Sequence, residues 1–446
     1  MPEEKSITPV VIPRQQHTVS RENISDGALK VLSVLNYEGH EAYIVGGGVR
    51  DLLLGRKPKD FDIVTDATPE QLKRIFRNCR LIGRRFRLAH VRMFGEILEV
   101  STFRDNIALE ETAAPGPEPE GDDGEMSDAE IEDEIDDETE EEAVEHPSQP
   151  VQPAPHGGKF IAREDGLVLR DNVYGTAETD ALRRDFTVNA LFYNLRDFSV
   201  IDYVGGMADI RDRVIRSIGP PDVRYTEDPV RMIRAIRIAS QLDCTIEPAS
   251  YQAIIDRRDH LAHANPHRLF EEVKKLLVSG AAEKIIDHLV ATGLFGILFP
   301  ELSDFASRDV ELAWLKRVTR QFDIWHKNHL TVSNELQLAL LFGKYHEQQA
   351  AALMQEGAPP HVALDVATRE HLTRLATRIA IPRFLATHIG QLMSVQPKFL
   401  VLKDSNAARL KHRGCYHDAF VYFKLNSRFS ARHHDEVKWW EEHRSV

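Results

Sequence analysis

The stretch VGGGVRDLLLGRKPKDFD, Val45 to Asp62, decides how the rest of the chain is interpreted. The short apolar run Ala42–Val45 predicts a strand, and the three glycines after it allow a tight turn and close approach of a ligand to the backbone. Val49–Leu54 then favours one or two helical turns, which Gly55 would end in a left-handed conformation. The free N–H groups at the start of this helix, together with Arg50, are suited to binding phosphate.

Two carboxylates follow the predicted helix, one residue apart. Alternation along a strand over Asp60–Val64 would place Asp60 and Asp62 on one face, where they repel each other unless a cation joins them. Mg²⁺ suits this spacing, because it binds one or two carboxylates plus substrate phosphates. Alone, the pair also fits a solvated edge strand, but the glycine turn and Arg50, ten residues before Asp60, favour a metal and phosphate site.

Two common nucleotide-binding motifs are excluded. The turn lacks the Gly-Lys-Ser/Thr end of a P-loop, and Gly46-x-Gly48-x-x-Asp51 has no third glycine of a dinucleotide fingerprint. The glycines, the Val-Arg-Asp at 49–51 and the Asp-x-Asp instead resemble the head of the nucleotidyltransferase superfamily that contains the CCA-adding enzymes and the bacterial poly(A) polymerases. This resemblance implies an α+β fold, with a small mixed-sheet head followed by an all-α neck, body and tail.

The pattern of apolar residues predicts further elements in the head. Thr68 and Pro69 are typical of a helix start, with Gln71 at the third helical position. We expect helices over Ile24–Leu35 and from Pro69 to about Phe76, strands over Cys79–Ile82, Leu88–Met93 and Glu96–Phe103, and a hairpin of Leu191–Asn194 with Val200–Val204.

A third motif, Arg-Arg-Asp-Phe-Thr-x-Asn-Ala, starts at Arg183 and resembles a third superfamily motif. The resemblance implies that Asp185 helps to hold the metals or the nucleotide ribose, and that Arg184 contacts phosphates. A surface salt bridge is the alternative for Asp185. Glu99, in the expected strand, is a rival for the third catalytic carboxylate, and the sequence does not rank the two.

An arginine helix follows the head. Asp228 is expected as its N-cap and Pro229 as its first residue, with Arg231, Arg234 and Arg237 at intervals of three along one stripe. Such a stripe also fits a solvated helix face. The Glu-Asp-x-x-Arg pattern resembles the motif with which the superfamily reads the incoming base and contacts the triphosphate, so Asp228 with Arg231 is expected on the base.

Composition sets outer limits on the function. No run approaches the roughly 20 apolar residues of a membrane span, and the N-terminal residues lack the order of a signal peptide. Cys79, Cys244 and Cys415 are widely spaced, which predicts neither disulfides nor zinc and fits a reducing, cytoplasmic setting.

Charge is concentrated in one block. Glu110–Glu145 contains nineteen Asp and Glu and no Lys or Arg, so removing it changes the net charge from −14 to +5. We expect a disordered insertion over 107–158. It either has no function of its own, screens a basic cleft or recruits a basic protein partner. Before it, the basic turn Arg84–Arg87 resembles a stretch that marks bacterial poly(A) polymerases rather than CCA-adding enzymes.

The domain boundaries expected from these patterns are a flexible tail over 1–20, the head over 21–219, a helical nucleotide- and RNA-binding neck over 220–300 and a helical RNA-binding region over 301–446. Near the C-terminus, Lys403–Lys438 has eight Lys and Arg against four Asp and Glu. Interleaved aromatics there could stack on bases, or they could form a helical core with a basic rim; they are Tyr416, Tyr422, Phe423 and Phe429.

The hypothesis from the sequence is a monomeric, template-independent polymerase that transfers AMP from ATP to RNA 3′ ends. In it, Asp60 and Asp62 bind two Mg²⁺ ions, with Mn²⁺ as the alternative, and pyrophosphate leaves. Gly46 and Gly47 with Arg50 cradle the phosphates. A CCA-adding enzyme and a non-catalytic RNA-binding module are the other readings.

Overall fold

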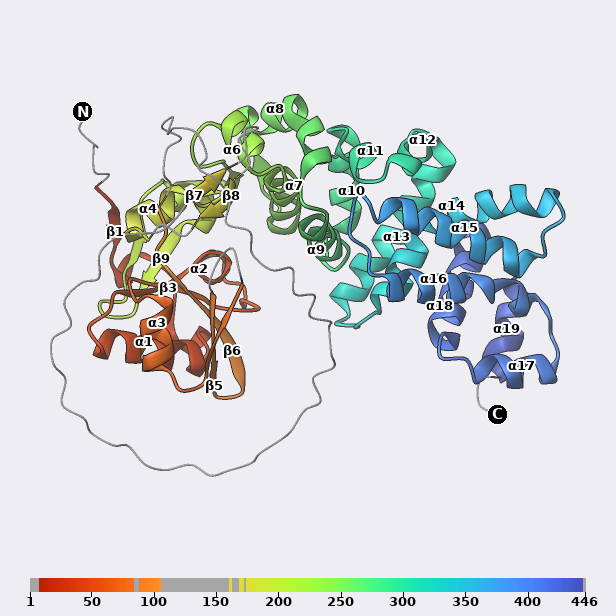
Figure 1. Ribbon diagram of the computed structural model, residues 1–446, viewed down its shortest axis with the longest axis horizontal. Helices are drawn as coiled ribbons and strands as arrows, with labels where there is room; N and C mark the ends of the chain where they lie inside the picture. The colour runs from red at the N-terminus through yellow and green to blue at the C-terminus, as the bar shows by residue number, and fades with distance from the viewer. Residues whose placement is uncertain (1–7, 84–87, 106–159, 163–167, 172–173, 444–446) are drawn as a thin grey trace, which may run out of the picture.

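The computed structural model describes residues 8–83, 88–105, 160–162, 168–171 and 174–443. The predicted basic turn over 84–87 and the acidic insertion over 107–158 lie outside these residues. A sheet with flanking helices comes first in the chain, and helices make up nearly all the rest (Figure 1). The α+β prediction is confirmed.

The head is built on a mixed sheet of eight strands in the order β1-β10-β9-β2-β3-β6-β5-β4. Neighbours are antiparallel except β3 and β6, which run parallel and place Asp62 beside Glu99. The strands are β1 Val10–Ile12, β2 Ala42–Val45, β3 Asp62–Thr65, β4 Cys79–Ile82, β5 Leu88–Met93, β6 Glu96–Thr102, β9 Leu191–Asn194 and β10 Val200–Asp202.

Two expectations at the sheet were wrong. Val10–Ile12 pairs with β10, so this part of the expected flexible tail is an edge strand. The strand expected over Asp60–Val64 begins only at Asp62, opposite Val45. The reason is that β2 ends at Val45 and the chain turns away at Gly46, which has a φ of 72°. On the β2 side no partner strand is therefore left for Asp60, which stays in the preceding loop.

Helices α1 Asp26–Tyr37 and α3 Pro69–Ile75 pack on the sheet. Buried residues of α1, among them Val31 and Leu35, share one apolar core with Ile44 and Ile63 of the sheet. The predicted capping box at Thr68 is present, because its hydroxyl accepts the N–H of Gln71 and the Gln71 side chain accepts the N–H of Thr68. Helix α2 Gly47–Leu53 follows the glycine turn directly.

A second apolar core runs without interruption from the end of the head through the helices to Trp440. The structure also contains two short strand pairs, β7 Phe160–Ala162 with β8 Val168–Asp171 and β11 Val214–Ile215 with β12 Thr245–Ile246. The helices are α4 Ala177–Leu182, α5 Gly206–Asp212, α6 Pro221–Glu227, α7 Val230–Leu242, α8 Pro248–Arg257, α9 Pro266–Leu277, α10 Ala282–Ala291, α11 Leu294–Leu298, α12 Ser303–Ala306, α13 Asp309–Lys327, α14 Asn334–Gln355, α15 Pro360–Leu375, α16 Arg383–Ser394, α17 Asp404–Lys411, α18 Tyr416–Ser430 and α19 His434–Glu442.

Two of the C-terminal aromatics expected to stack on bases belong to this core. Tyr422 is fully buried, and its hydroxyl donates to Glu347 at 3.0 Å. Phe423 is buried and stacks on Phe399, with ring centroids 5.0 Å apart. For Tyr422 and Phe423 the structure therefore bears out the alternative of a helical core and not base stacking, because apolar burial of their rings leaves no free face.

The helical part also contains a buried histidine pair. His346 Nε2 and His371 Nδ1 are 2.9 Å apart, and both residues are fully buried. The remaining ring nitrogens have no hydrogen-bond partner within the described part of the chain. Burial lowers the pKa of His371 to about 3, and burial with the neighbouring imidazole lowers the pKa of His346 well below its usual value.

This pair predicts a loss of stability in mild acid. At pH 5 the unfolded chain binds a proton at His371 that the folded chain does not, so the free energy of unfolding falls as the pH drops below about 6.5. For His371 the loss between pH 7 and pH 5 amounts to about 2 kcal/mol. Urea unfolding at both pH values measures the decrease in the free energy of unfolding from pH 7 to pH 5. This decrease should be smaller by about 2 kcal/mol in His371→Gln than in the exposed control His361→Gln. An equal pH dependence in both variants would contradict the assignment.

Candidate active site

The glycine turn brings an aspartate and an arginine together at one edge of the sheet. Gly46 lies between β2 and α2 with a positive φ, a conformation that residues with a Cβ rarely adopt. A Cβ at Gly46 would lie 3.5 Å from Arg184 Nη1 and 3.6 Å from Asp62 Oδ2. At Gly47 the nearest atom would be Arg50 Nη2, at 3.4 Å. Gly46 therefore lies within van der Waals reach of Arg184 and Asp62, and Gly47 within reach of Arg50.

The carboxylates of Asp60, Asp62 and Glu99 form a negative site at this edge. Asp62 and Glu99 are register partners on the parallel strands β3 and β6, so their side chains share a face. Desolvation by the surrounding protein, together with the charges of Glu99 and Asp60, raises the pKa of Asp62 to about 6. Unneutralised carboxylates of this kind fit a hard divalent cation.

These carboxylates would suit a metal ion that takes its remaining ligands from the substrate. Among the described residues, no three His, Cys, Asp or Glu side chains lie close enough together to hold a metal ion by themselves. Mg²⁺ usually keeps waters and takes substrate phosphates in addition to one or two carboxylates. Asp60 and Asp62 therefore suit a divalent ion that completes its ligands with a nucleotide, and Glu99 stands next to them.

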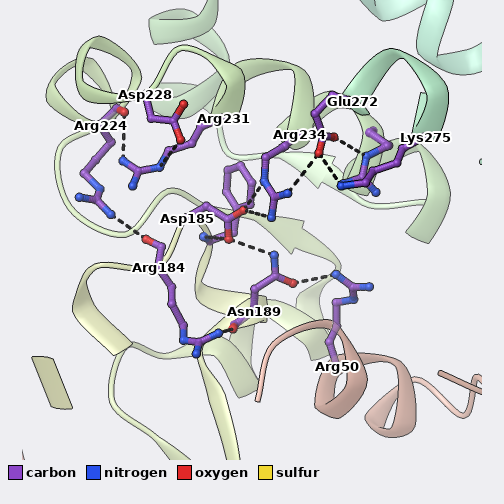
Figure 2. Close-up of polar contacts among 12 residues, drawn as sticks. Arg50, Arg184, Asp185, Asn189, Arg224, Asp228, Arg231, Arg234, Glu272 and Lys275 are labelled. Carbon is purple, nitrogen blue, oxygen red and sulfur yellow. Dashed lines mark hydrogen bonds and ion pairs between the residues drawn. The ribbon is translucent and has the colours of Figure 1, made fainter. Parts of the chain in front are cut away.

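The carboxylate of Asp185 is bound by several protein groups. Its carboxylate accepts from Arg234, 2.7 Å away, from the side-chain amide of Asn189 at 3.1 Å and from the N–H of Phe186 at 2.9 Å (Figure 2). Burial alone would raise the pKa of Asp185, but Arg234 and Asn189 outweigh it and hold the pKa well below its usual range. The residue therefore serves here as an anchor for α7, and its oxygens are already occupied.

Arg50 is joined to this anchor through Asn189. Arg50 Nη1 donates to Asn189 Oδ1 at 2.7 Å, while Arg50 Nε donates to Asp51 at 2.9 Å. Figure 2 shows Asn189 between Arg50 and Asp185. The sequence reasoning assigned no role to Asn189, although its place in the third motif was the available signal.

Arg184 is held by a buried carboxylate that the sequence reasoning also missed. Asp180, on α4, is fully buried and pairs with Arg184 at 2.7 Å and with Arg183 at 3.0 Å. Burial raises the pKa of Asp180, and the two arginines outweigh it to give a lowered pKa. Arg184 also lies over the ring of Phe192, 5.4 Å from the ring centre. Its guanidinium is therefore fixed at the turn that carries Gly46.

The arginine stripe of α7 is not a solvated face. Arg234 pairs with Asp185 and with Glu272 of α9 at 3.4 Å, and Arg237 pairs with Glu272 at 3.0 Å. Arg231 donates to the carbonyl of Arg224 at 3.1 Å. All three stripe residues are at most one-third exposed, and Ile233 and Ile236 face the core as expected. The stripe thus faces the head and α9.

Asp228 does not cap α7, which corrects the expectation from sequence. Helix α6 ends at Glu227, and Pro229 occupies the N-cap of α7 without a side-chain bond. The Asp228 carboxylate instead accepts from both Nη atoms of Arg268 on α9, at 2.9 and 2.7 Å. The chain therefore forms two helices, α6 and α7, separated by Asp228 and Pro229, where only the second was expected. Arg268, forty residues away, carried no signal in the sequence.

Three family models match successive parts of the chain. A model described as the poly A polymerase head domain matches residues 42–216. A model of a probable RNA and SrmB-binding site of polymerase A matches 243–305, and one of the polymerase A arginine-rich C-terminus matches 356–446.

Relatives that match along nearly the whole chain are poly(A) polymerases. Poly(A) polymerase I of Escherichia coli O157:H7 is 38% identical over 443 residues, which cover 97% of this chain and 85% of the relative. Poly(A) polymerase I of Haemophilus influenzae is 36% identical over 445 residues, with 97% and 87% covered. The chain belongs to the poly(A) polymerase I family. Like its relatives in the poly(A) polymerase I family, it is a polynucleotide adenylyltransferase, with a nucleotide substrate and a divalent metal.

CCA-adding enzymes are more distant. One matches this chain in sequence over part of its length, and one solved structure matches it in fold. The CCA-adding enzyme of Bacillus subtilis is 32% identical over 268 residues, 60% of this chain and 54% of that enzyme. The solved CCA-adding enzyme of Bacillus stearothermophilus in complex with CTP matches with a TM-score of 0.59 at 24% identity, covering 94% of this chain and 80% of that one.

Proposed function

We propose that the chain is a template-independent poly(A) polymerase, which transfers AMP from ATP to RNA 3′ ends and releases pyrophosphate. The observation that carries the proposal is likeness to Poly(A) polymerase I along 97% of the chain, with Asp60 and Asp62 close to the glycine turn. The sequence likeness to the Bacillus subtilis CCA-adding enzyme covers only 60% of the chain, which favours the polymerase.

Asp60 and Asp62 would hold Mg²⁺, with Mn²⁺ as the alternative. Bound there, divalent ions would supply Lewis-acid activation of the RNA 3′-hydroxyl and charge neutralisation at the triphosphate. Phosphate oxygens would bind near Gly46 and Gly47, where Arg184 and Arg50 lie close to the backbone at the start of α2. Asn189 and Asp180 orient these two guanidinium groups before the substrate arrives.

The base would be read at the start of α7. Asp228 offers acceptors and Arg231 offers donors, which together can match the edge of adenine. Arg268 fixes the Asp228 carboxylate through two bonds. Arg234 and Arg237, expected on the triphosphate, are paired with Asp185 and Glu272, so we assign them first to holding α7 in place.

Glu99, rather than Asp185, is our choice for the third catalytic carboxylate, because it adjoins Asp62 and raises its pKa. Glu99→Gln should lower kcat by roughly 10- to 100-fold while the KM for ATP stays within twofold, as expected for a group that supports a metal site. Steady-state AMP incorporation measures both constants. His90→Gln, which removes the imidazole 3.8 Å from Glu99, is the control and should stay near wild type. A wild-type kcat in Glu99→Gln would contradict the choice.

Nucleotide incorporation tests the function itself. The substrates are a short unstructured RNA and a tRNA lacking its 3′ end, each with ATP alone, CTP alone and both. Long extension of the unstructured RNA with ATP alone is the expected result. Addition of two C and one A to the tRNA only would replace the proposal with CCA repair, and no incorporation with either Mg²⁺ or Mn²⁺ would favour the binding module.

The setting follows from the same proposal. No helix in the described ranges has the length and apolar character to cross a bilayer. We propose a cytoplasmic, monomeric enzyme whose partners are ATP and RNA 3′ ends, and which can recruit a basic protein through the acidic block.

A further inference from the structure

A cavity of about 810 Å³ lies in the head beside Asp60, outside the nucleotide contacts described above. Three segments form its walls. They are the loop over 55–61 between α2 and β3, the residues 22–26 that lead into α1, and residues 96–98 at the start of β6. The volume is in the range of cavities that hold a nucleotide-sized ligand. Because Asp60 is part of its lining, whatever binds there lies next to the proposed metal site.

The loop wall of the cavity is basic. Arg56, Lys57 and Lys59 line it, and both lysines are exposed. Neither lysine has an ion-pair partner among the residues that the structure describes. Arg56 donates to the backbone carbonyl of Gln241 on α7 at 3.0 Å, which ties the loop to the neck. Two unneutralised cations thus stand on an anchored loop directly before a proposed metal ligand.

The opposite wall is acidic and argues against a second triphosphate. Glu22, Asp26 and Glu96 line it, and Glu96 also accepts from the hydroxyl of Ser25 at 2.6 Å. Carboxylates repel a polyanion but accept hydrogen bonds from ribose hydroxyls and exocyclic amino groups. A ligand with phosphates on one side and a nucleoside on the other matches both walls, and the end of an RNA strand has this arrangement.

The position of the cavity agrees with in-line attack. The phosphates that leave are proposed to bind at the start of α2, by Gly46 and Gly47. Leu52 and Gly55, at the other end of this roughly 10 Å helix, line the cavity. In phosphoryl transfer the attacking and leaving oxygens are roughly in line on opposite sides of the phosphorus. The attacking 3′-hydroxyl would therefore approach from the side of the cavity.

We propose that this cavity, with Lys57 and Lys59, is the subsite for the 3′-terminal nucleotides of the RNA strand. The lysines contact backbone phosphates, and the terminal nucleoside lies between them and the acidic wall, with its 3′-hydroxyl toward Asp60. The inference rests on the proposed function, since it concerns how that reaction holds its second substrate.

The test compares the full-length protein with the double variant Lys57→Gln/Lys59→Gln. The matched control is Lys30→Gln/Lys73→Gln, which changes two exposed lysines of α1 and α3 outside the cavity lining. In steady-state extension of oligoadenylate, the KM for RNA should rise at least about tenfold in the test variant, because two phosphate contacts are lost. Its KM for ATP should stay within twofold, and the control should match wild type in both constants.

A binding measurement separates this inference from the proposed function. Fluorescence anisotropy of a fluorescein-labelled oligoadenylate, without ATP, should give weaker binding by the test variant. The slope of log K against log salt should fall by about 1.4, since each single-strand phosphate contact contributes about 0.7. An unchanged slope and RNA KM would overturn the subsite, as would an equal rise in the KM for ATP. Weaker binding and a lower slope without any AMP transfer by wild type would support the subsite while the polymerase proposal fails.

Discussion

Asp62→Asn is expected to abolish AMP transfer, with kcat lowered by about a thousandfold or more, which corresponds to about 4 kcal/mol of transition-state stabilisation. Asp62 starts β3 at the position where the glycine turn, Arg184 and Glu99 converge. An amide cannot supply the charge that a divalent ion needs, so both positioning of the triphosphate and activation of the 3′-hydroxyl should fail. Single-turnover incorporation of AMP into unstructured RNA, at saturating metal, measures the chemical step directly.

The fold of Asp62→Asn should remain intact. Because desolvation, Glu99 and Asp60 raise the pKa of Asp62 to about 6, its charge is unfavourable in the unliganded protein at neutral pH. The melting temperature of the variant should therefore equal or exceed that of wild type. Asp259→Asn, which changes an aspartate that is 87% exposed, is the control for activity. Wild-type activity in Asp62→Asn would remove the basis of the catalytic proposal.

Glu272→Ala is expected to lower the free energy of unfolding by about 3–5 kcal/mol. Glu272 is buried on α9 and receives Arg234 at 3.4 Å, Arg237 at 3.0 Å and Lys275 at 3.1 Å (Figure 2). Removing it takes away the carboxylate partner of the largely buried Arg237, while Arg234 keeps Asp185. The cost of an unpaired buried charge exceeds the value of the lost pair itself. Equilibrium unfolding in urea, with the m-value checked against wild type, measures the effect.

The neighbouring residue gives a matched control. Glu271 is 57% exposed, and its one ion pair among the residues that the structure describes is with Lys274 across one turn of α9, so Glu271→Ala should cost less than about 1 kcal/mol. Equal losses in Glu271→Ala and Glu272→Ala would mean that α9 propensity, and not the buried pairs, sets the effect. A second variant, Glu272→Gln, keeps the size of the side chain. It should still show most of the decrease in the free energy of unfolding expected for Glu272→Ala.

Local elements of the head could be predicted because their signals lie within a few residues. The capping box at Thr68, the short helix after the glycines and the β9–β10 hairpin follow from turn chemistry and apolar periodicity, and the structure contains all of them. The edge strand Val10–Ile12 could not be predicted in this way. Val10–Ile12 is a short β-branched run, but its partner β10 lies nearly two hundred residues later, and nothing nearby in the sequence indicates that pairing.

The sequence also identified the charged groups of the site better than their partners. Arg50, Arg184 and Arg234 were expected on phosphates, yet each has a fixed carboxylate or amide partner from another element. An ion pair or hydrogen bond depends on distance in space, which separations of 35 to 139 residues in the chain do not reveal. For this reason Asn189, Glu272 and Arg268 received no role at first. Asp180 lies only four residues before Arg184, so its pairing was a local signal that was missed.

The sequence by itself determined that the chain carries a glycine turn, an Asp-x-Asp pair and an arginine helix in the order of a nucleotidyltransferase, because these features are local patterns of residue type. Only the tertiary structure showed that Glu99 lies beside Asp62 and that Asp185 is paired with Arg234. This arrangement depends on the parallel pairing of β3 with β6, and on Arg234 reaching Asp185 from the neighbouring helix. Strand register and helix packing bring together residues far apart in the chain, and no spacing within the sequence encodes them.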